Sequence, residues 1–361
     1  MRIKSVETVT LKIPFDDLYA GPRTKQRGWT AFDTVLVRVE TDDGLTGWGE
    51  AFAYNCASAV RAAIKDMVAP LVVGRDIEDI PALNRELQKE LHIWGRYGIT
   101  IFALSGLDIA LWDLAAKRQG KSLAAHLGGR QRDTVPAYAS LVRYVGAQPV
   151  AAMAKQAAAE GYADIKLHET VYETIAAARG AVGDDIRLTT DVNCAWSLDE
   201  AEAILPKLKA LDLFWVEEPV FPPEDYDTLF DLGAFGVPLA AGENACTAME
   251  FARLIPALTY PQPSVIKVGG ITEFMAVATL ARAAGKTVMP HSPYFGPGYW
   301  ATLQLAAHLD NIGLFEFLYV RPEAWLGRDI PLPQNGRIAI PDRPGIGFES
   351  DDEMIRRYRV A

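Results

Sequence analysis

The sequence predicts an α/β barrel that follows a smaller α+β domain. From Val135 onward, eight short apolar segments of strand character alternate with helical segments, which is the order of a parallel barrel. Strands that alternate apolar and polar residues, and then helical segments, come before this barrel part of the chain. Three acids, Asp191, Glu217 and Glu243, are 26 residues apart in turn, close to one βα unit. Each acid would therefore lie at the end of a successive strand, and the three would converge.

The first part of the chain has the pattern of an antiparallel sheet. Residues 3–14 and 34–40 alternate between apolar and polar side chains, and an Asp43-Gly44 pair follows as a turn signal. A helix is expected next, ending near Gly120. Apolar residues recur in it at helical spacing, at Ala103, Leu107, Leu111 and Leu114.

The eight expected barrel strands are VPAYAS, ADIKLH, IRLTTDVN, LFWVEEP, PLAAGEN, SVIKVGG, KTVMPHS and GLFEFL. After Glu316 the sequence becomes rich in proline and glycine, so we expect this last segment to pack back on the first domain. The predicted division is 1–127 for the α+β capping domain, 128–325 for the barrel and 326–361 for a segment that returns to the cap.

Composition narrows the class of protein. Among 361 residues, 46 acids and 36 lysines and arginines give a net charge of −10, and no basic cluster suggests nucleic acid as a partner. The three cysteines form no CxxC pair, which favours a reducing compartment. No signal-peptide segment follows Met1 and charges interrupt the long apolar runs, so we expect a cytoplasmic protein without a membrane partner.

Acids at neighbouring strand ends indicate a metal site. The C-terminal face of a barrel is where its chemistry takes place. Hard oxygen ligands without a cysteine nearby suit Mg²⁺, with open positions for water and substrate. Burying three such acids without a cation would be costly.

Two longer stretches resemble a known family. The segment Ala103–Gly129, ALSGLDIALWDLAAKRQGKSLAAHLGG, is similar to the cap-to-barrel signature of the mandelate racemase and muconate lactonizing enzyme group of the enolase superfamily, although His126 replaces the usual aliphatic residue. LTTDVN through VEEP keeps that family's metal-ligand spacing. The resemblance covers nearly the whole chain and implies a modified TIM barrel, (β/α)7β, with an α+β cap formed by the N-terminal region and the C-terminal tail.

The resemblance also implies roles for the three acids. Asp191, Glu217 and Glu243 would bind Mg²⁺, and Asn193 would lie beside the metal. A proton next to a carboxylate is weakly acidic, because its removal places a second negative charge on an anionic group. A divalent ion on the substrate carboxylate would stabilise this enediolate as a Lewis acid.

Four basic residues are candidates for the acid and base roles. Lys166 and His168 are two apart on an expected strand, so both would face the barrel interior. The resembled family usually has Lys-x-Lys there, with the second lysine as base. Here the second position is His168, and a neutral histidine accepts a proton at physiological pH. Which of Lys166, His168, Lys267 and His291 is the base therefore stays open.

The remaining candidates match different branches of the family. Lys267, expected on the sixth strand, resembles the lysine that muconate-type members place on the opposite face of the substrate. The racemase branch has an aspartate three residues earlier, where this chain has Ser264. His291 resembles the seventh-strand histidine of acid sugar dehydratases, which could protonate a leaving hydroxide. Glu316 resembles an acid of the racemase branch that hydrogen-bonds the substrate carboxylate while protonated.

The leading hypothesis is a lyase that dehydrates a small hydroxy acid, such as a sugar acid or a hydroxyproline-like acid, after Mg²⁺-dependent removal of its α-proton. A racemase or epimerase is the alternative, because bases on strands two and six would flank the substrate, and a cycloisomerase could use the same groups. A barrel that binds a carboxylate without turnover is the hypothesis from another class.

Substrate choice is expected to come from the cap. The segment FDDLYAGPRTKQRGW, residues 15–29, has the composition of a lid between two strands. The candidate specificity residues of this segment are Tyr19, Arg23, Lys25 and Trp29. Further candidates are Tyr54 and Asn55 after the hairpin, and Tyr294 and Phe295 after His291. A homo-oligomer is expected from the resemblance alone.

Overall fold

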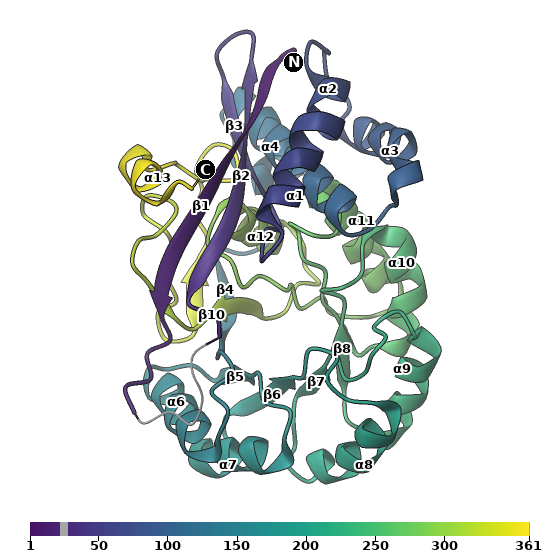
Figure 1. Ribbon diagram of the computed structural model, residues 1–361, viewed down its shortest axis with the longest axis vertical. Helices are drawn as coiled ribbons and strands as arrows, with labels where there is room; N and C mark the ends of the chain where they lie inside the picture. The colour runs from purple at the N-terminus through teal and green to yellow at the C-terminus, as the bar shows by residue number, and fades with distance from the viewer. Residues whose placement is uncertain (22–27, 361) are drawn as a thin grey trace.

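The computed structural model describes residues 1–21 and 28–360, so Arg23 and Lys25 lie outside the described residues (Figure 1). One end of the molecule is an antiparallel sheet in the order β11-β1-β2-β3. Its main strands are β1 (Ile3–Asp16), β2 (Ala31–Thr41) and β3 (Thr46–Ala51). Gly44 has a φ of +83° in the turn between β2 and β3, as the Asp43-Gly44 pair predicts.

The other end is a closed parallel barrel. Its strands are β4 (Thr134–Ser140), β5 (Asp164–Leu167), β6 (Arg187–Asp191), β7 (Trp215–Glu217), β8 (Leu239–Ala241), β9 (Tyr260–Pro261) and β10 (Phe315–Leu318). Neighbours pair in this order, and β10 pairs with β4. The predicted α/β barrel with an antiparallel cap is confirmed.

The sixth expected strand was placed a few residues too late, whereas the seventh lies within its expected residues but is very short. The sixth strand is β9, and residues 264–269 form a turn in which Lys267 N donates to Ser264 O at 2.9 Å. Pro261 and Pro263 have no amide hydrogen for a ladder, which explains why the strand ends early. Residues 288–289 take the seventh place, since Met289 N donates to Pro261 O at 3.0 Å and Gly313 N to Val288 O at 2.9 Å.

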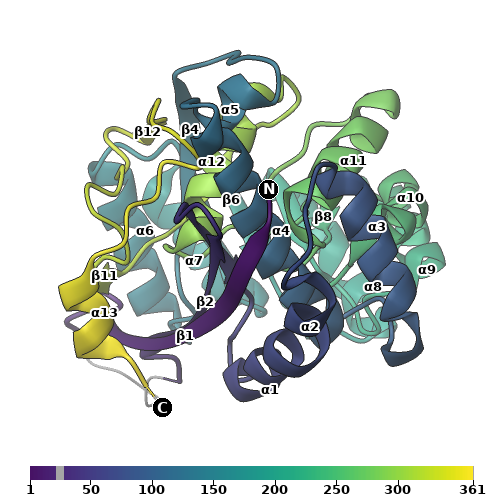
Figure 2. The ribbon, with the colours of Figure 1, turned by 90° about the horizontal axis from the view of Figure 1, so that it is seen from above.

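Helices surround the barrel and complete the cap (Figures 1 and 2). The barrel helices are α6 (Ala147–Ala159), α7 (Tyr172–Val182), α8 (Leu198–Lys209), α9 (Tyr226–Leu232), α10 (Thr247–Leu254), α11 (Gly270–Ala283) and α12 (Pro297–His308). The cap contributes α1 (Ala57–Ala62), a π-helical turn (Ala63–Val68), α2 (Ala69–Val72), α3 (Ile80–Glu90), α4 (Ile99–Arg118) and α5 (Leu123–His126).

Helix α4 fixes the cap on the barrel. Ser105, Asp108 and Trp112 share one face because they are three and four residues apart. Asp108 accepts hydrogen bonds from the amide (3.0 Å) and hydroxyl (2.6 Å) of Thr272, and Ser105 Oγ accepts one from Gly269 N at 2.9 Å. These bonds hold the turn that carries Lys267. By length and composition α4 could cross a membrane, but 78% of its apolar window is buried, so it is a core helix.

The chain after β10 returns to the cap. β11 (Arg321–Pro322) pairs with β1, and β12 (Arg337–Ala339) pairs with the barrel strand β4. Helix α13 (Asp352–Tyr358) lies beside β1, as Figure 2 shows, and Val360 N donates to Thr10 O at 2.9 Å. We keep the division at residues 127 and 325 as a proposal.

The contact between β3 and α4 leaves no room for a side chain at Gly49. A Cβ there would overlap the carbonyl oxygen of Gly106 and lie 3.0 Å from Ala110 N. Because both obstacles are backbone, we expect Gly49→Ala to lower the free energy of unfolding by about 3 kcal/mol. Urea denaturation measures this. Gly180→Ala is the control: nothing lies near that helical position, so it should stabilise by about 1 kcal/mol. Equal effects of the two variants would contradict the packing argument.

Candidate active site

Lys166 lies at the centre of a buried cluster of acids. Its Nζ is 2.7 Å from Glu217 Oε1, 2.9 Å from Glu316 Oε1 and 3.3 Å from Asp191 Oδ2. The three acids come from β7, β10 and β6, and Lys166 comes from β5. In the ladder Asp191 pairs with Glu217, which brings the ends of β6 and β7 together as the spacing predicts.

The cluster favours the charged forms of Lys166, Asp191 and Glu316, whereas at Glu217 burial outweighs the Lys166 ammonium and raises the pKa of the carboxyl well above its usual value. Burial works against a charge on Lys166, but the carboxylates of Glu217 and Glu316 outweigh it and hold the pKa of Lys166 well above its usual value. Burial likewise opposes ionisation of Asp191 and Glu316, yet the Lys166 ammonium holds the pKa of each below its usual value. Glu316 is therefore ionised in this state, whereas the resemblance implied a protonated acid. The reason is its ion pair with Lys166.

Glu217 is held from two sides. Its Oε2 accepts hydrogen bonds from Trp215 Nε1 at 3.0 Å and Gln262 Nε2 at 2.8 Å, while Oε1 faces Lys166. Trp215 is two residues earlier on the same strand, so the period of a strand could have identified it. Gln262 comes from the end of β9 and carries no such signal in the sequence.

His168 follows β5 and has one defined orientation. Its Nδ1 is 2.5 Å from Leu141 O, and its Nε2 is 3.3 Å from Asp191 Oδ2. A carbonyl oxygen only accepts, so a neutral His168 carries its proton on Nδ1 and leaves Nε2 as the acceptor. The main-chain carbonyl of His168 accepts from Arg143 Nε at 2.5 Å, and Arg143 also donates to Asn193 Oδ1 at 3.2 Å.

Glu243 and His291 form a pair at the barrel mouth. Glu243 Oε2 is 2.5 Å from His291 Nε2. Burial opposes the charge on Glu243, but His291 and Lys267 lower its pKa to about 2. His291 Nδ1 is buried and has no hydrogen-bond partner in the described part of the chain. Ser264, which stands where the racemase branch has an aspartate, donates to the hydroxyl of Tyr294 at 3.4 Å.

A pocket of about 450 Å³ lies between the barrel mouth and the cap. Of the predicted residues it is lined by His168, Asn193, Glu243, Lys267, His291, Trp29, Tyr54 and Tyr294. Phe295 also lines it. The Lys166 cluster is buried and is not part of the lining, and neither is Tyr19, whose ring lies 6.0 Å from that of Tyr144. Lys267 Nζ lies 4.7 Å from the centre of the Phe52 ring.

The cap contributes polar groups that sequence reasoning missed. Asp33, Thr34 and Glu50 line the pocket from β2 and β3. They were missed because the alternation of apolar and polar residues in a strand shows which residues share a face of the sheet. It does not show whether that face packs on the core or lines a pocket. Glu50 is buried, accepts one hydrogen bond from Gly298 N at 2.9 Å, and so joins the cap to the start of α12.

Burial raises the pKa of Glu50 from 4.5 to about 7. The folded protein therefore holds a proton there that the unfolded chain has lost, so Glu50 lowers the free energy of unfolding as the pH rises through this window. Glu50→Gln removes the titration. As the pH rises from about 5 to about 8, the free energy of unfolding should fall by about 3 kcal/mol more in the natural protein than in the variant, as measured by urea denaturation. Parallel curves for the two proteins would contradict this.

The acids also fit a metal ion by their chemistry. Asp191 and Glu217 already converge on one cation, the Lys166 ammonium, and all donors are the hard oxygens that Mg²⁺ prefers. As the described side chains stand, no group of three metal-binding residues is close enough to hold an ion, and Glu243 faces His291. Asp191, Glu217 and Glu243 would be the ligands.

Known proteins resemble this chain over its whole length. Residues 24–128 match the mandelate racemase/muconate lactonizing enzyme N-terminal domain, and residues 149–354 match the enolase C-terminal domain-like family. Arabinonate dehydratase of Saccharolobus solfataricus is 30% identical, over 91% of each chain. D-galactarolactone cycloisomerase of Agrobacterium fabrum is 31% identical, over 100% of this chain and 99% of that one.

Solved structures agree with this relation. The 3,6-anhydro-D-galactonate cycloisomerase from Zobellia galactanivorans has a TM-score of 0.86 at 25% identity, covering 100% of both chains. A mandelate racemase/muconate lactonizing protein from Paracoccus denitrificans, complexed with magnesium, has a TM-score of 0.85 at 26% identity, covering 99% of this chain and 97% of that one. This chain is therefore an enzyme of the mandelate racemase/muconate lactonizing enzyme family in the enolase superfamily.

Proposed function

We propose that the protein dehydrates a sugar acid, with His168 as the base that removes the α-proton. The observation that carries this proposal is the orientation of His168, whose Nδ1 faces a carbonyl oxygen and whose Nε2 is left to accept a proton in the pocket. Asp191, 3.3 Å from Nε2, would stabilise the charge that His168 gains. Lys166 is a poorer base because its proton is held by three carboxylates.

Other groups of the pocket complete the reaction. Mg²⁺, when bound, would supply a Lewis acid for the substrate carboxylate. His291 would donate a proton to the departing hydroxide, and Asn193 would contact the substrate beside the acids. Trp29, Tyr54 and Tyr294 would form walls against the carbon skeleton, with Asp33 and Thr34 as acceptors for hydroxyl groups.

The test is proton NMR of sugar acids, arabinonate and galactonate among them, incubated in D₂O with Mg²⁺ and enzyme. Formation of a 2-keto-3-deoxy acid is the expected result. His291→Asn should keep deuterium exchange at Cα and lose dehydration by about 10² to 10⁴-fold, since only the acid for the leaving group is removed. If every sugar acid and hydroxyproline tested stays unchanged, the proposal fails.

A cycloisomerase or an epimerase is the second candidate. It is favoured by Lys267, which lines the same pocket and, within residues 1–21 and 28–360, has no carboxylate at ion-pair distance. Such a lysine could return a proton to the substrate. Deuterium at Cα with the carbon skeleton intact, or ring opening of a lactone or anhydro acid, would support this candidate over dehydration.

A further inference from the structure

An exposed arginine at the barrel mouth joins two residues of the pocket. Arg143, in the loop after β4, donates from Nε to the main-chain oxygen of His168 at 2.5 Å and from Nη2 to Asn193 Oδ1 at 3.2 Å. His168 follows β5 and Asn193 follows β6, so one side chain links the ends of three successive strands. Arg143 is not part of the pocket lining, whereas His168 and Asn193 are. Any effect of Arg143 on the reaction therefore acts through these two residues.

The loop that carries Arg143 is fixed against the loop after β5. Leu141 N donates to Lys166 O at 2.8 Å, and Tyr144 N donates to Glu169 Oε1 at 2.9 Å. Glu169 is buried, so this second bond is shielded from water. Because the backbone is held on both sides of Arg143, the guanidinium loses only the freedom of its own side chain when it reaches its acceptors.

The bond from Arg143 determines which way the Asn193 amide faces. A guanidinium has only donors, so the amide oxygen must face it. Nδ2 is then the end of the amide that can donate to an oxygen of a ligand in the pocket. The backbone of Asn193 is constrained as well, because its φ is +47° and its N donates to Asp191 Oδ1 at 2.8 Å. Asn193 therefore has one defined orientation beside an acid of the Lys166 cluster.

The bond to the carbonyl of His168 restrains this residue through its backbone. The two ring nitrogens of His168 contact Leu141 O at 2.5 Å and Asp191 Oδ2 at 3.3 Å. Both distances depend on where the backbone of His168 lies, and β5 has already ended at this residue. The charge-assisted bond from Arg143 supplies a restraint there that the strand no longer gives. A lysine would be a poor substitute, because its ammonium lacks the planar fork that spans two acceptors in a fixed geometry.

We propose that Arg143 is a positioning residue for the removal of the α-proton. It holds the acceptor nitrogen of His168 and the donor nitrogen of Asn193 in the geometry of the reaction without touching the substrate. This inference rests on the proposed function, in which His168 is the base. A displacement of about 1 Å in a reacting group can cost about 10²-fold in rate, so restraints of this kind are large enough to affect catalysis.

Deuterium exchange at Cα of sugar acids tests the kinetic effect. Arg143→Ala should lower the kcat of exchange by about 10 to 10²-fold with a smaller change in KM, because the base is misplaced while the pocket walls remain. Arg143→Lys should recover only part of this loss. Added guanidinium, below denaturing concentration, should raise the rate of Arg143→Ala and leave the natural protein unchanged, since the exposed site admits it. A loss of stability alone would not be rescued in this way.

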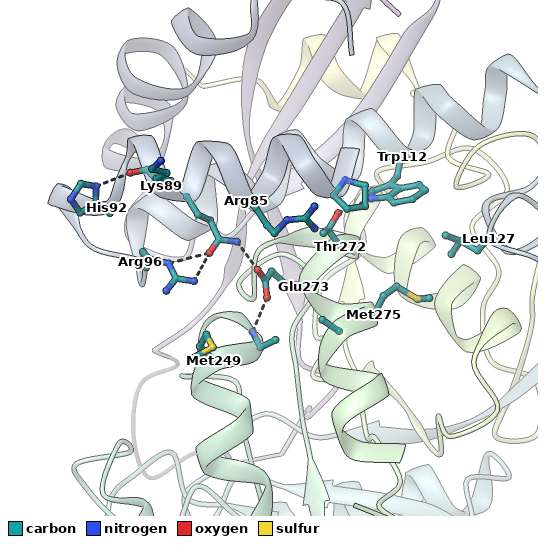
Figure 3. A pocket seen from close by; sticks show the side chains of 14 residues that line it. Arg85, Lys89, His92, Arg96, Trp112, Leu127, Met249, Thr272, Glu273 and Met275 are labelled. Carbon is teal, nitrogen blue, oxygen red and sulfur yellow. Dashed lines mark hydrogen bonds between the residues drawn. The ribbon is translucent and has the colours of Figure 1, made fainter. Parts of the chain in front are cut away.

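Arg96→Ala is the matched control. Arg96 is likewise exposed and donates from Nε and Nη2, in its case to Gln88 Oε1 at 3.2 Å and 2.7 Å, in a groove between α3 and α10 (Figure 3). The control loses two bonds of the same kind away from the pocket, so kcat and KM should stay unchanged. Circular dichroism checks that both variants are folded, and Arg143→Gln replaces Arg143→Ala if the latter does not fold.

A second readout needs no substrate. The Nδ1 proton of His168, held against Leu141 O, should exchange with water at least about tenfold faster in Arg143→Ala, because the contact opens more often. Proton NMR of the imidazole N–H signals measures this, and His168→Asn identifies the signal. If the natural protein exchanges no acid at Cα, the proposed function fails, and this proton still decides the role of Arg143. An unchanged exchange of this proton with water would overturn that role. So would a natural kcat in Arg143→Ala while His168→Asn loses activity, and the proposed function would then stand.

Discussion

Replacing His168 by asparagine is expected to lower the rate of α-proton exchange by about 10² to 10⁴-fold, or about 3–5 kcal/mol of activation free energy. The asparagine amide can still donate to Leu141 O, so the backbone around β5 should keep its shape. What it cannot do is accept a proton at the position of Nε2. Deuterium incorporation at Cα of a sugar acid, followed by NMR, measures this loss directly.

Lys267→Met is the control for this experiment. Lys267 lines the same pocket but faces the Phe52 ring, so its loss should leave exchange by His168 in place while abolishing any proton return from the other side. If His168→Asn exchanges at the natural rate, His168 is not the base. Lys166 would then have to give up its proton despite its three carboxylates.

The sequence located this site because barrel geometry is repetitive. Asp191 and Glu217 are at equivalent places in successive βα units, so their spacing alone predicted that they pair across β6 and β7. The two-residue period of a β-strand likewise predicted that Lys166 and His168 face the same side, and both side chains contact Asp191. Backbone regularity is a local property, and sequence patterns record it well.

Features set by tertiary contacts could not be predicted in this way. Lys267 lies on a turn because prolines end β9 and α4 holds the following residues, and neither effect has a periodic signal. Glu50 reaches the pocket only because the cap packs on α12. The pairing of Glu243 with His291 depends on a side-chain rotamer and on charge balance, which no spacing reveals.

Lys166→Met is expected to destabilise the protein strongly in the absence of Mg²⁺ and only weakly in its presence. Removing the lysine leaves Asp191, Glu217 and Glu316 buried without the ammonium that pairs with all three. Breaking a buried ion pair on one side costs about 3–5 kcal/mol, because the remaining charges are uncompensated. Urea denaturation with a chelator, and again with excess Mg²⁺, measures both states.

The same experiment separates a metal site from a buried salt bridge. An ion held by Asp191, Glu217 and Glu243 would replace the missing charge and stabilise the variant by about 3 kcal/mol at a hundredfold excess over its Kd. Lys267→Met is the comparison: Lys267 lies at ion-pair distance from none of these acids among the described residues, so with the chelator its loss should cost far less stability than the loss of Lys166. If Mg²⁺ leaves the stability of Lys166→Met unchanged, the acids form an ion-pair cluster with Lys166 and do not bind a metal ion. The metal-dependent reaction would then lose its physical basis.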